Sequence, residues 1–221
     1  MNPIFPSILS TTFFDLEAKL ADFNANGIEV IHLDVMDGHF VEQISFGTSM
    51  LTAIRSRFSF AFDAHLMVSN PGRMIPLFLS AGAEWISFHI ETEEAVRENI
   101  ARIRNGKSRA GLAVNPDAPV DRIFPFLSDL DYVLLMSVFP GYGGQKFIES
   151  AIERVRQLKR KILAERLDCL IEVDGGIHTG DVGRLLEAGA DLFVMGTSLF
   201  RSRDIRGDLE KIDSQLHGRR K

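Results

Sequence analysis

Short apolar runs alternate along the chain with longer amphipathic segments. The apolar runs are nearly continuous rather than alternating, which is typical of strands buried on both faces of a parallel sheet. They predict eight strands, over residues 4–9, 30–36, 60–67, 85–90, 110–115, 132–138, 170–174 and 192–195. The amphipathic segments predict eight helices, over residues 15–26, 47–57, 71–81, 93–104, 119–127, 148–165, 181–188 and 206–216.

Eight consecutive strand–helix units in 221 residues predict an α/β fold, a (β/α)₈ TIM barrel in which residues 1–221 form one domain. Gly27, Gly82 and Gly189 each follow a predicted helix, where a C-terminal glycine belongs. A doubly wound open sheet is the alternative. Such a sheet usually carries a glycine-rich turn after its first strand, whereas here residues 10–12 read Ser-Thr-Thr.

The second predicted strand carries the most informative polar residues. His32 and Asp34 are two positions apart, so both side chains leave the same face of the strand, between apolar neighbours that leave the other face. A buried carboxylate beside an imidazole is costly unless it is paired, and a bound metal ion would offset that cost. His65 and Asp174 end two other predicted strands. The carboxyl ends of barrel strands form the catalytic face, so we expect the four to meet there.

Two imidazoles and two carboxylates suit one divalent metal ion, such as Zn²⁺, Fe²⁺, Mn²⁺ or Co²⁺, and the sequence does not choose among these. Asp34 and Asp174 lie on the second and seventh strands, so they would approach a central substrate from different sides. Opposed carboxylates suit a proton transfer that inverts a carbon, because one removes the proton and the other returns it to the opposite face. A metal between them could stabilise an enediolate. The alternative is that both aspartates serve only as ligands.

Glycine-rich loops follow the last three predicted strands, and they contain Gly141, Tyr142, Gly143 and Gly144, then Gly175 and Gly176, then Gly196 and Thr197. Glycines let backbone N–H groups approach an anion closely. In barrels the loops after strands seven and eight commonly hold a phosphate group. The three loops together therefore predict a phosphate site.

Three methionines, Met36, Met67 and Met136, fall at predicted strand ends. They are interpreted either as ordinary core residues or as an apolar floor beneath an enediolate. Lys146 is interpreted as a solvated loop lysine rather than a phosphate ligand. His89 ends the fourth strand but has no partner that the sequence reveals.

Composition limits the partners and the compartment. The chain has 25 Lys+Arg against 30 Asp+Glu, which argues against nucleic acid or an anionic membrane as the main partner. A lone cysteine, Cys169, excludes an intramolecular disulfide and fits a reducing compartment. There is no signal-peptide pattern and no apolar run of membrane-spanning length, so the expected location is the cytoplasm. Residues 216–221 are expected to be a disordered basic tail, and the sequence leaves open whether the barrel forms a homo-oligomer.

Five motifs, in order and at barrel spacing, resemble the ribulose-phosphate 3-epimerase family. They are residues 6–10 (PSILS), 32–41 (HLDVMDGHFV), 65–68 (HLMV), 136–147 (MSVFPGYGGQKF) and 171–177 (IEVDGGI). The resemblance implies a ribulose-phosphate-binding barrel and a metal-dependent isomerase. This epimerase interconverts D-ribulose 5-phosphate and D-xylulose 5-phosphate at C3 in the pentose phosphate pathway or the Calvin cycle.

The resemblance also implies residue roles. Asp34 would accept a proton and Asp174 would donate one, with the roles exchanged in reverse, and the metal would be held by His32, Asp34, His65 and Asp174. Ser7 and His65 would contact the substrate. The phosphate would lie on the backbone of Gly143, Gly144, Gly176, Gly196 and Thr197.

The sequence departs from the family pattern where Glu42-Gln43 replace the usual Pro-Asn, where Phe139 replaces a commonly polar residue, and where Thr197 replaces a serine. One alternative function is an allulose-6-phosphate 3-epimerase, and another is a non-catalytic sugar-phosphate- or metal-binding barrel. The orotidine monophosphate decarboxylase group is rejected, because its Asp-x-Lys-x-x-Asp array is absent at residues 34–37.

Overall fold

The computed structural model describes residues 2–92 and 95–217. Eight parallel strands form one sheet in the order β1-β8-β7-β6-β5-β4-β3-β2. A further parallel bridge between Ser7 and His32 joins the β1 and β2 edges, so the sheet closes into a barrel. The strands are β1 (Ile4–Pro6), β2 (Val30–Met36), β3 (Ala61–Met67), β4 (Trp85–His89), β5 (Arg109–Val114), β6 (Tyr132–Met136), β7 (Leu170–Asp174) and β8 (Leu192–Met195). The expected (β/α)₈ fold is confirmed.

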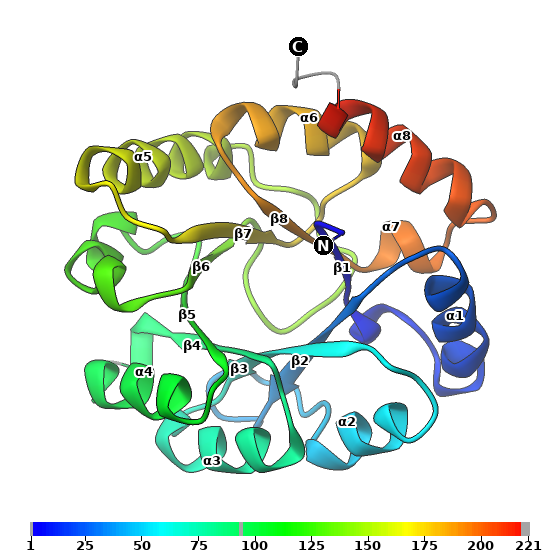
Figure 1. The fold of residues 1–221 in the computed structure, drawn as a ribbon, viewed down its shortest axis with the longest axis horizontal. Helices are drawn as coiled ribbons and strands as arrows, with labels where there is room; N and C mark the ends of the chain where they lie inside the picture. Colours follow the sequence, from blue (N-terminus) through cyan, green and yellow to red (C-terminus); the bar gives the residue numbers. More distant parts are fainter. Residues whose placement is uncertain (1, 93–94, 218–221) are drawn as a thin grey trace.

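Helices surround the strands on the outside of the barrel, as Figure 1 shows. The α-helices are α1 (Phe13–Ala25), α2 (Thr48–Arg55), α3 (Pro71–Ala81), α4 (Val96–Asn105), α5 (Ser150–Glu165), α6 (Thr179–Ala188), α7 (Thr197–Phe200) and α8 (Ile205–His217). Three 3₁₀ helices are η1 (Ile8–Ser10), η2 (Ile90–Thr92) and η3 (Val120–Asp129). None of the helices in the described part of the chain is long and apolar enough to cross a membrane.

The structure differs from the predicted elements in several places. The first strand stops at Pro6 rather than residue 9, because the Ser7 hydroxyl accepts the backbone N–H of Leu9 and turns the chain into η1. The helix expected over 119–127 is the 3₁₀ helix η3, in whose interior Pro125 has no N–H to donate. The short helix α7 lies where a loop was expected. Helix α8 includes residues 216 and 217 of the expected tail, and residues 218–221 lie outside the described part.

Two apolar layers enclose each strand. On β2, Ile31, Leu33 and Val35 face outward into the core between the sheet and the helices. At the amino-terminal ends of the strands, the barrel interior is filled by a second cluster that includes Phe5, Trp85 and Tyr132. Burial on both faces explains the continuous apolar runs of the sequence. The same inward face becomes polar toward the carboxyl ends, and there the candidate site lies.

Glycine is required beside the large ring of Tyr132 in this interior. Gly111 on β5 lies against that ring, and an added Cβ would clash with it. The ring is also held edge-on by Trp85, at 5.1 Å between centroids. This packing fixes the position of the Tyr132 hydroxyl, which reaches the underside of the polar layer.

Candidate functional site

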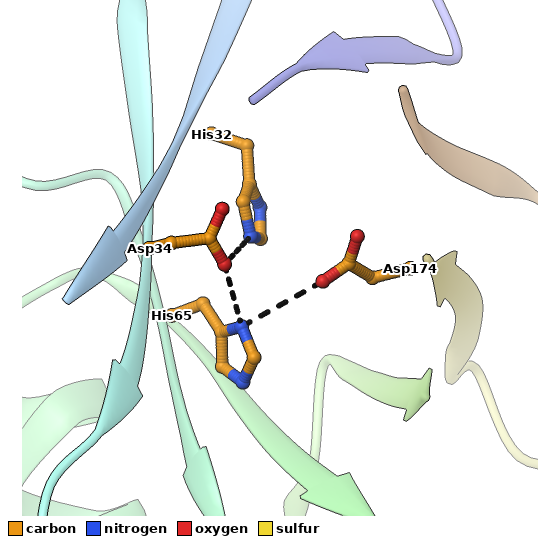
Figure 2. Close-up of side chains that lie close together, drawn as sticks. All are labelled: His32, Asp34, His65 and Asp174. Atoms are coloured by element: carbon orange, nitrogen blue, oxygen red, sulfur yellow. Dashed lines mark hydrogen bonds and ion pairs between the residues drawn. The ribbon is translucent and has the colours of Figure 1, made fainter. Parts of the chain in front are cut away.

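The structure brings together the four residues that the sequence predicted as metal ligands. His32 and Asp34 project from β2, His65 from β3, and Asp174 from the end of β7, on the opposite side of the group (Figure 2). One donor atom from each lies within 4.8 Å of all the others. The pairing of Asp34 with His65 in the β2–β3 register places these two side by side.

These donor atoms surround one point without pairing fully with one another. Nδ1 of His65 is 3.3 Å from Oδ1 of Asp34 and 3.9 Å from Oδ2 of Asp174. Nε2 of His32 is 3.5 Å from Oδ1 of Asp34 and is buried without a hydrogen-bond partner among the described residues. A buried orphan nitrogen beside two carboxylates and a second imidazole is the donor set of a divalent cation. The residues therefore fit such an ion.

His32 is held from the side that faces away from the site. Its Nδ1 lies 2.6 Å from Oδ2 of Asp63, and Oδ1 of Asp63 accepts the Tyr132 hydroxyl at 2.9 Å. Burial lowers the pKa of His32, but the charges of Asp63 and Asp34 outweigh burial and raise it well above the ordinary value. A carboxylate behind a metal-ligating imidazole fixes the ring orientation and leaves the other nitrogen toward the metal.

The two aspartates have opposite electrostatic surroundings. Burial opposes the charge of Asp34, but the positive charge of His32, together with the nearby His65 ring, outweighs burial, and the pKa of Asp34 is lowered. The Ser7 hydroxyl also donates to Oδ2 of Asp34 at 2.5 Å. Burial, followed by the charge of Asp34, raises the pKa of Asp174 to about 7. Asp34 thus stays charged, whereas Asp174 takes up a proton as the pH falls through about 7.

His65 is suited to remain neutral. Burial lowers its pKa to about 4, although the adjacent Asp34 carboxylate acts in the opposite direction. A neutral imidazole keeps a lone pair available, as metal ligation requires.

A cavity of about 210 Å³ opens above this layer. Asp34 and Asp174 reach its wall, whereas His32 and His65 are fully buried beneath it. The other residues predicted to bind substrate all line the cavity, namely Ser7, Gly141, Tyr142, Gly143, Gly144, Gly175, Gly176, Gly196 and Thr197, as do Met36, Met67 and Met136.

The glycine-rich loops pack closely on one side of this cavity. A Cβ on Gly176, which has φ +66°, would lie 2.6 Å from the backbone nitrogen of Phe147, so these two loops meet backbone to backbone. The Thr197 hydroxyl donates to the Ser10 hydroxyl at 3.2 Å, which ties the eighth loop to the first. The loops therefore form one polar wall of the cavity.

Several residues of the site were not predicted. Asp63 precedes His65 by two positions and so shares its face of β3, which is a signal that the sequence does contain. Tyr132 and Ser10 gave no signal of their own. Arg201 also lines the cavity and is its cationic residue, whereas the exposed Lys146 does not line it.

The sequence revealed no partner for His89, and the structure gives it two. Its Nε2 lies 2.8 Å from Nε2 of His65, and its Nδ1 lies 3.1 Å from Oε2 of Glu91. Sequence alone could not reveal this, because the contact to His65 depends on how β3 and β4 sit side by side in the barrel.

Comparison with known proteins decides the family. The sequence model described as the Ribulose-phosphate 3 epimerase family matches residues 3–200. The chain belongs to the ribulose-phosphate 3-epimerase family. The expected resemblance is therefore confirmed, and so is the expectation of an epimerase.

Relatives within this family match along almost their whole length. A ribulose-phosphate 3-epimerase of Aquifex aeolicus is 42% identical over 218 residues, covering 98% of this chain and 97% of that protein. The corresponding proteins of Bacillus subtilis and Escherichia coli are 39% and 38% identical, each over 96% of this chain, and 98% and 95% of those proteins are covered.

Solved structures of lower sequence identity share the fold. The 3-hexulose-6-phosphate synthase of Salmonella typhimurium superposes with a TM-score of 0.69 at 17% identity, over 98% of this chain and 99% of that one. KGPDC of Streptococcus mutans superposes with a TM-score of 0.67 at 15% identity, over 99% of this chain and 98% of that one. At such identities the likeness concerns the barrel alone.

Proposed function

We propose that this epimerase interconverts D-ribulose 5-phosphate and D-xylulose 5-phosphate by inverting C3, with Asp34 and Asp174 as the acid/base pair. The observation that carries the proposal is the placement of the two carboxyls, which reach one cavity from β2 and from β7 on opposite sides of the group (Figure 2). A sugar carbon between them would present one face to each carboxyl. Family membership supports the substrate.

The proton transfers balance between the two aspartates. In one direction Asp34 takes the proton from C3 and becomes neutral, while Asp174 gives its own proton to the opposite face of C3 and becomes charged. The reverse reaction exchanges these roles. The lowered pKa of Asp34 and the raised pKa of Asp174 support this division, because a base must start charged and an acid protonated.

We also propose that His32, Asp34, His65 and Asp174 hold one divalent metal ion, Zn²⁺, Fe²⁺, Mn²⁺ or Co²⁺. When bound, such an ion polarises the substrate carbonyl and stabilises the negative charge that develops as the C3 proton leaves. The chain's own contribution is orientation. Asp63 holds His32 and Ser7 holds Asp34, so the donor atoms stay aimed at one point.

The rest of the cavity suits the remainder of a sugar phosphate. Backbone N–H groups of Gly143, Gly144, Gly176, Gly196 and Thr197 would bind the phosphate, and the wall that these loops share supports that assignment. Arg201, which lines the same cavity, adds a positive charge. Ser7, which lines the cavity, would contact the sugar, whereas the buried His65 would serve as a metal ligand beneath it.

Met36, Met67 and Met136 would form an apolar floor that keeps water from the reacting carbon. We place this activity in the cytoplasm and in the pentose phosphate pathway, and the free, buried Cys169 fits a reducing compartment. We further propose that residues 1–221 act as a single barrel domain.

The test is a coupled assay that follows D-xylulose 5-phosphate production from D-ribulose 5-phosphate. Purified protein is assayed as isolated, after chelation, and after adding back each of the four divalent metals. We expect chelation to remove the activity and a divalent metal to restore it. Activity on allulose 6-phosphate but not on the pentulose would contradict the proposed substrate, and undiminished activity after complete chelation would contradict the metal.

A further inference from the structure

His89 ends β4 and lies fully buried behind His65. Its Nε2 is 2.8 Å from Nε2 of His65, and its Nδ1 is 3.1 Å from Oε2 of Glu91. The second oxygen of Glu91, Oε1, accepts the backbone N–H of Asn115 at 2.9 Å. These contacts form a continuous chain from the four-residue site to Glu91, whose side chain is 18% exposed.

The hydrogen-bonding roles along this chain follow from its carboxylate end. An ionised Glu91 can only accept, so Nδ1 of His89 must donate to it. A neutral imidazole has one donor and one acceptor, so Nε2 of His89 accepts from an Nε2–H of His65. Nδ1 of His65 is then left with its lone pair, and this is the atom that faces Asp34 and Asp174.

The other imidazole of the site follows the same rule with its nitrogens exchanged. Asp63 accepts from Nδ1 of His32, which leaves Nε2 of His32 toward the site. A carboxylate therefore directs each ring, directly for His32 and through His89 for His65. The shared outcome is that each ring turns one ring nitrogen to the same point.

Packing holds the His89 ring in the orientation that this chain needs. The Phe40 ring lies against it with 4.6 Å between centroids, and the His65 ring lies 4.9 Å away at an interplanar angle of 29°. The Thr92 hydroxyl donates to the His89 carbonyl at 2.8 Å, which anchors the end of β4.

We propose that His89 and Glu91 are positioning residues of the metal centre, and that together they hold His65 in the Nε2–H tautomer with its Nδ1 lone pair directed at the cation. This inference rests on the metal site of the proposed function. Neither ring gains or loses a proton in this account, because only the choice of ring nitrogen is set. Hydrogen-bond partners on the far side of a metal-ligating histidine typically change metal affinity or activity by about 10–100-fold.

The test measures Zn²⁺ affinity of the metal-free protein in competition with a chromophoric chelator. His89→Phe keeps a ring against Phe40 but removes the acceptor, and we expect Zn²⁺ affinity to fall by about 10–100-fold. His89→Gln returns an amide oxygen to the position and should recover part of that loss. Glu91→Gln has one amide oxygen for two donors, His89 and Asn115, so it should also weaken Zn²⁺ binding.

The matched control for Glu91→Gln is Glu210→Gln, an exposed position on α8 that should leave Zn²⁺ affinity unchanged. A second readout is the ¹⁵N spectrum of histidine-labelled, Zn²⁺-loaded protein, in which the His65 proton should reside on Nε2. A merely structural role for His89 would change thermal stability but not this tautomer.

The outcomes separate this inference from the proposed function. If His65→Ala abolishes Zn²⁺ binding while folded His89→Phe and Glu91→Gln bind as tightly as the wild type, the positioning role is wrong and the metal site stands. A His65 proton on Nδ1 in the loaded wild-type protein would also overturn the positioning role. If the wild type binds Zn²⁺ but does not epimerise ribulose 5-phosphate with any metal, the proposed reaction is wrong and the positioning role is judged on affinity alone.

Discussion

The β2 side and the β7 side of the site hold the same kind of residue in different surroundings. Asp34, on β2, is met by Ser7, His32 and His65 and has a lowered pKa. Asp174, at the end of β7, lies 3.9 Å from the neutral His65 ring and has a pKa raised to about 7. Placement of donors and burial, rather than residue type, therefore sets how readily each carboxyl takes up a proton.

The strongest test of this contrast removes each carboxylate in turn. Asp34→Asn and Asp174→Asn should each lower kcat by about 10²–10⁴-fold, the usual contribution of a positioned acid or base. In deuterium oxide, Asp174→Asn should still introduce deuterium at C3 of ribulose 5-phosphate without forming xylulose 5-phosphate, because Asp34 remains. Asp34→Asn should not do so.

Circular dichroism and thermal unfolding serve as controls, since Asn is nearly isosteric with Asp and the barrel should stay folded. A near-wild-type rate in Asp174→Asn would mean that the two-carboxylate mechanism is wrong. Identical exchange in both variants would mean that the two sides do not differ in role.

His65 connects the two sides, because its Nδ1 lies near both aspartates. We expect His65→Ala to lower bound metal and epimerase activity together, by about 100-fold or more if a metal ligand is lost. Metal content by atomic emission, measured beside turnover, checks this. A variant that is metal-free but fully active would exclude the metal-assisted reaction.

Metal binding should depend on pH through Asp174 and His32. Asp34, Asp63 and His32 are the charged groups that influence Asp174. Below about pH 7 the metal-free protein holds a proton on Asp174 that competes with the cation, so this group alone should lower affinity by about tenfold per pH unit as pH drops. His32, whose pKa is also raised, releases a further proton.

Calorimetry in buffers of different ionisation enthalpy counts these protons. Zn²⁺ binding should release about one proton more at pH 6 than at pH 8, because the pKa of Asp174 is about 7. Asp174→Asn should lose this difference between the two pH values. An unchanged count in that variant would show that Asp174 is already charged near neutral pH.

The smallest expected effect comes from removing one donor on the β2 side. Ser7→Ala takes a hydrogen bond from the charged form of Asp34, so the pKa of Asp34 should rise and kcat should fall by roughly tenfold, the cost of one hydrogen bond to a charged group. The acid limb of the pH–rate profile should move to higher pH. Ser56→Ala, an exposed serine at the end of α2, is the matched control.

Much of this site could be predicted from local sequence patterns. The two-residue spacing of His32 and Asp34 sets them on one face of β2, and apolar runs ending in His65 and Asp174 place those residues at strand ends. Contacts between strands could not be predicted in this way. The Asp63–Tyr132 hydrogen bond joins β3 to β6, and the pairing of His65 with His89 depends on ring orientation, which no sequence period encodes.

Local geometry explains the remaining differences. The amphipathic pattern predicted a helix over residues 119–127, and the chain forms the 3₁₀ helix η3 there, with Pro125 inside it. Glycine patterns located the loops after β6, β7 and β8, yet not the side chain of Arg201, because an arginine on a loop has no pattern of its own.

The seam of the barrel couples assembly to activity. Strand β1 pairs with β8 near the other end of the chain, and the bridge from Ser7 to His32 completes the ring. Ser7 is also the residue that donates to Asp34. The backbone N–H of Ser7 donates to the Met195 carbonyl, so Ser7 is held on both sides only once residues 193–195 have emerged and docked on residues 4–6. Such a contact between distant parts of the chain forms slowly, so the appearance of turnover during synthesis would report barrel closure itself.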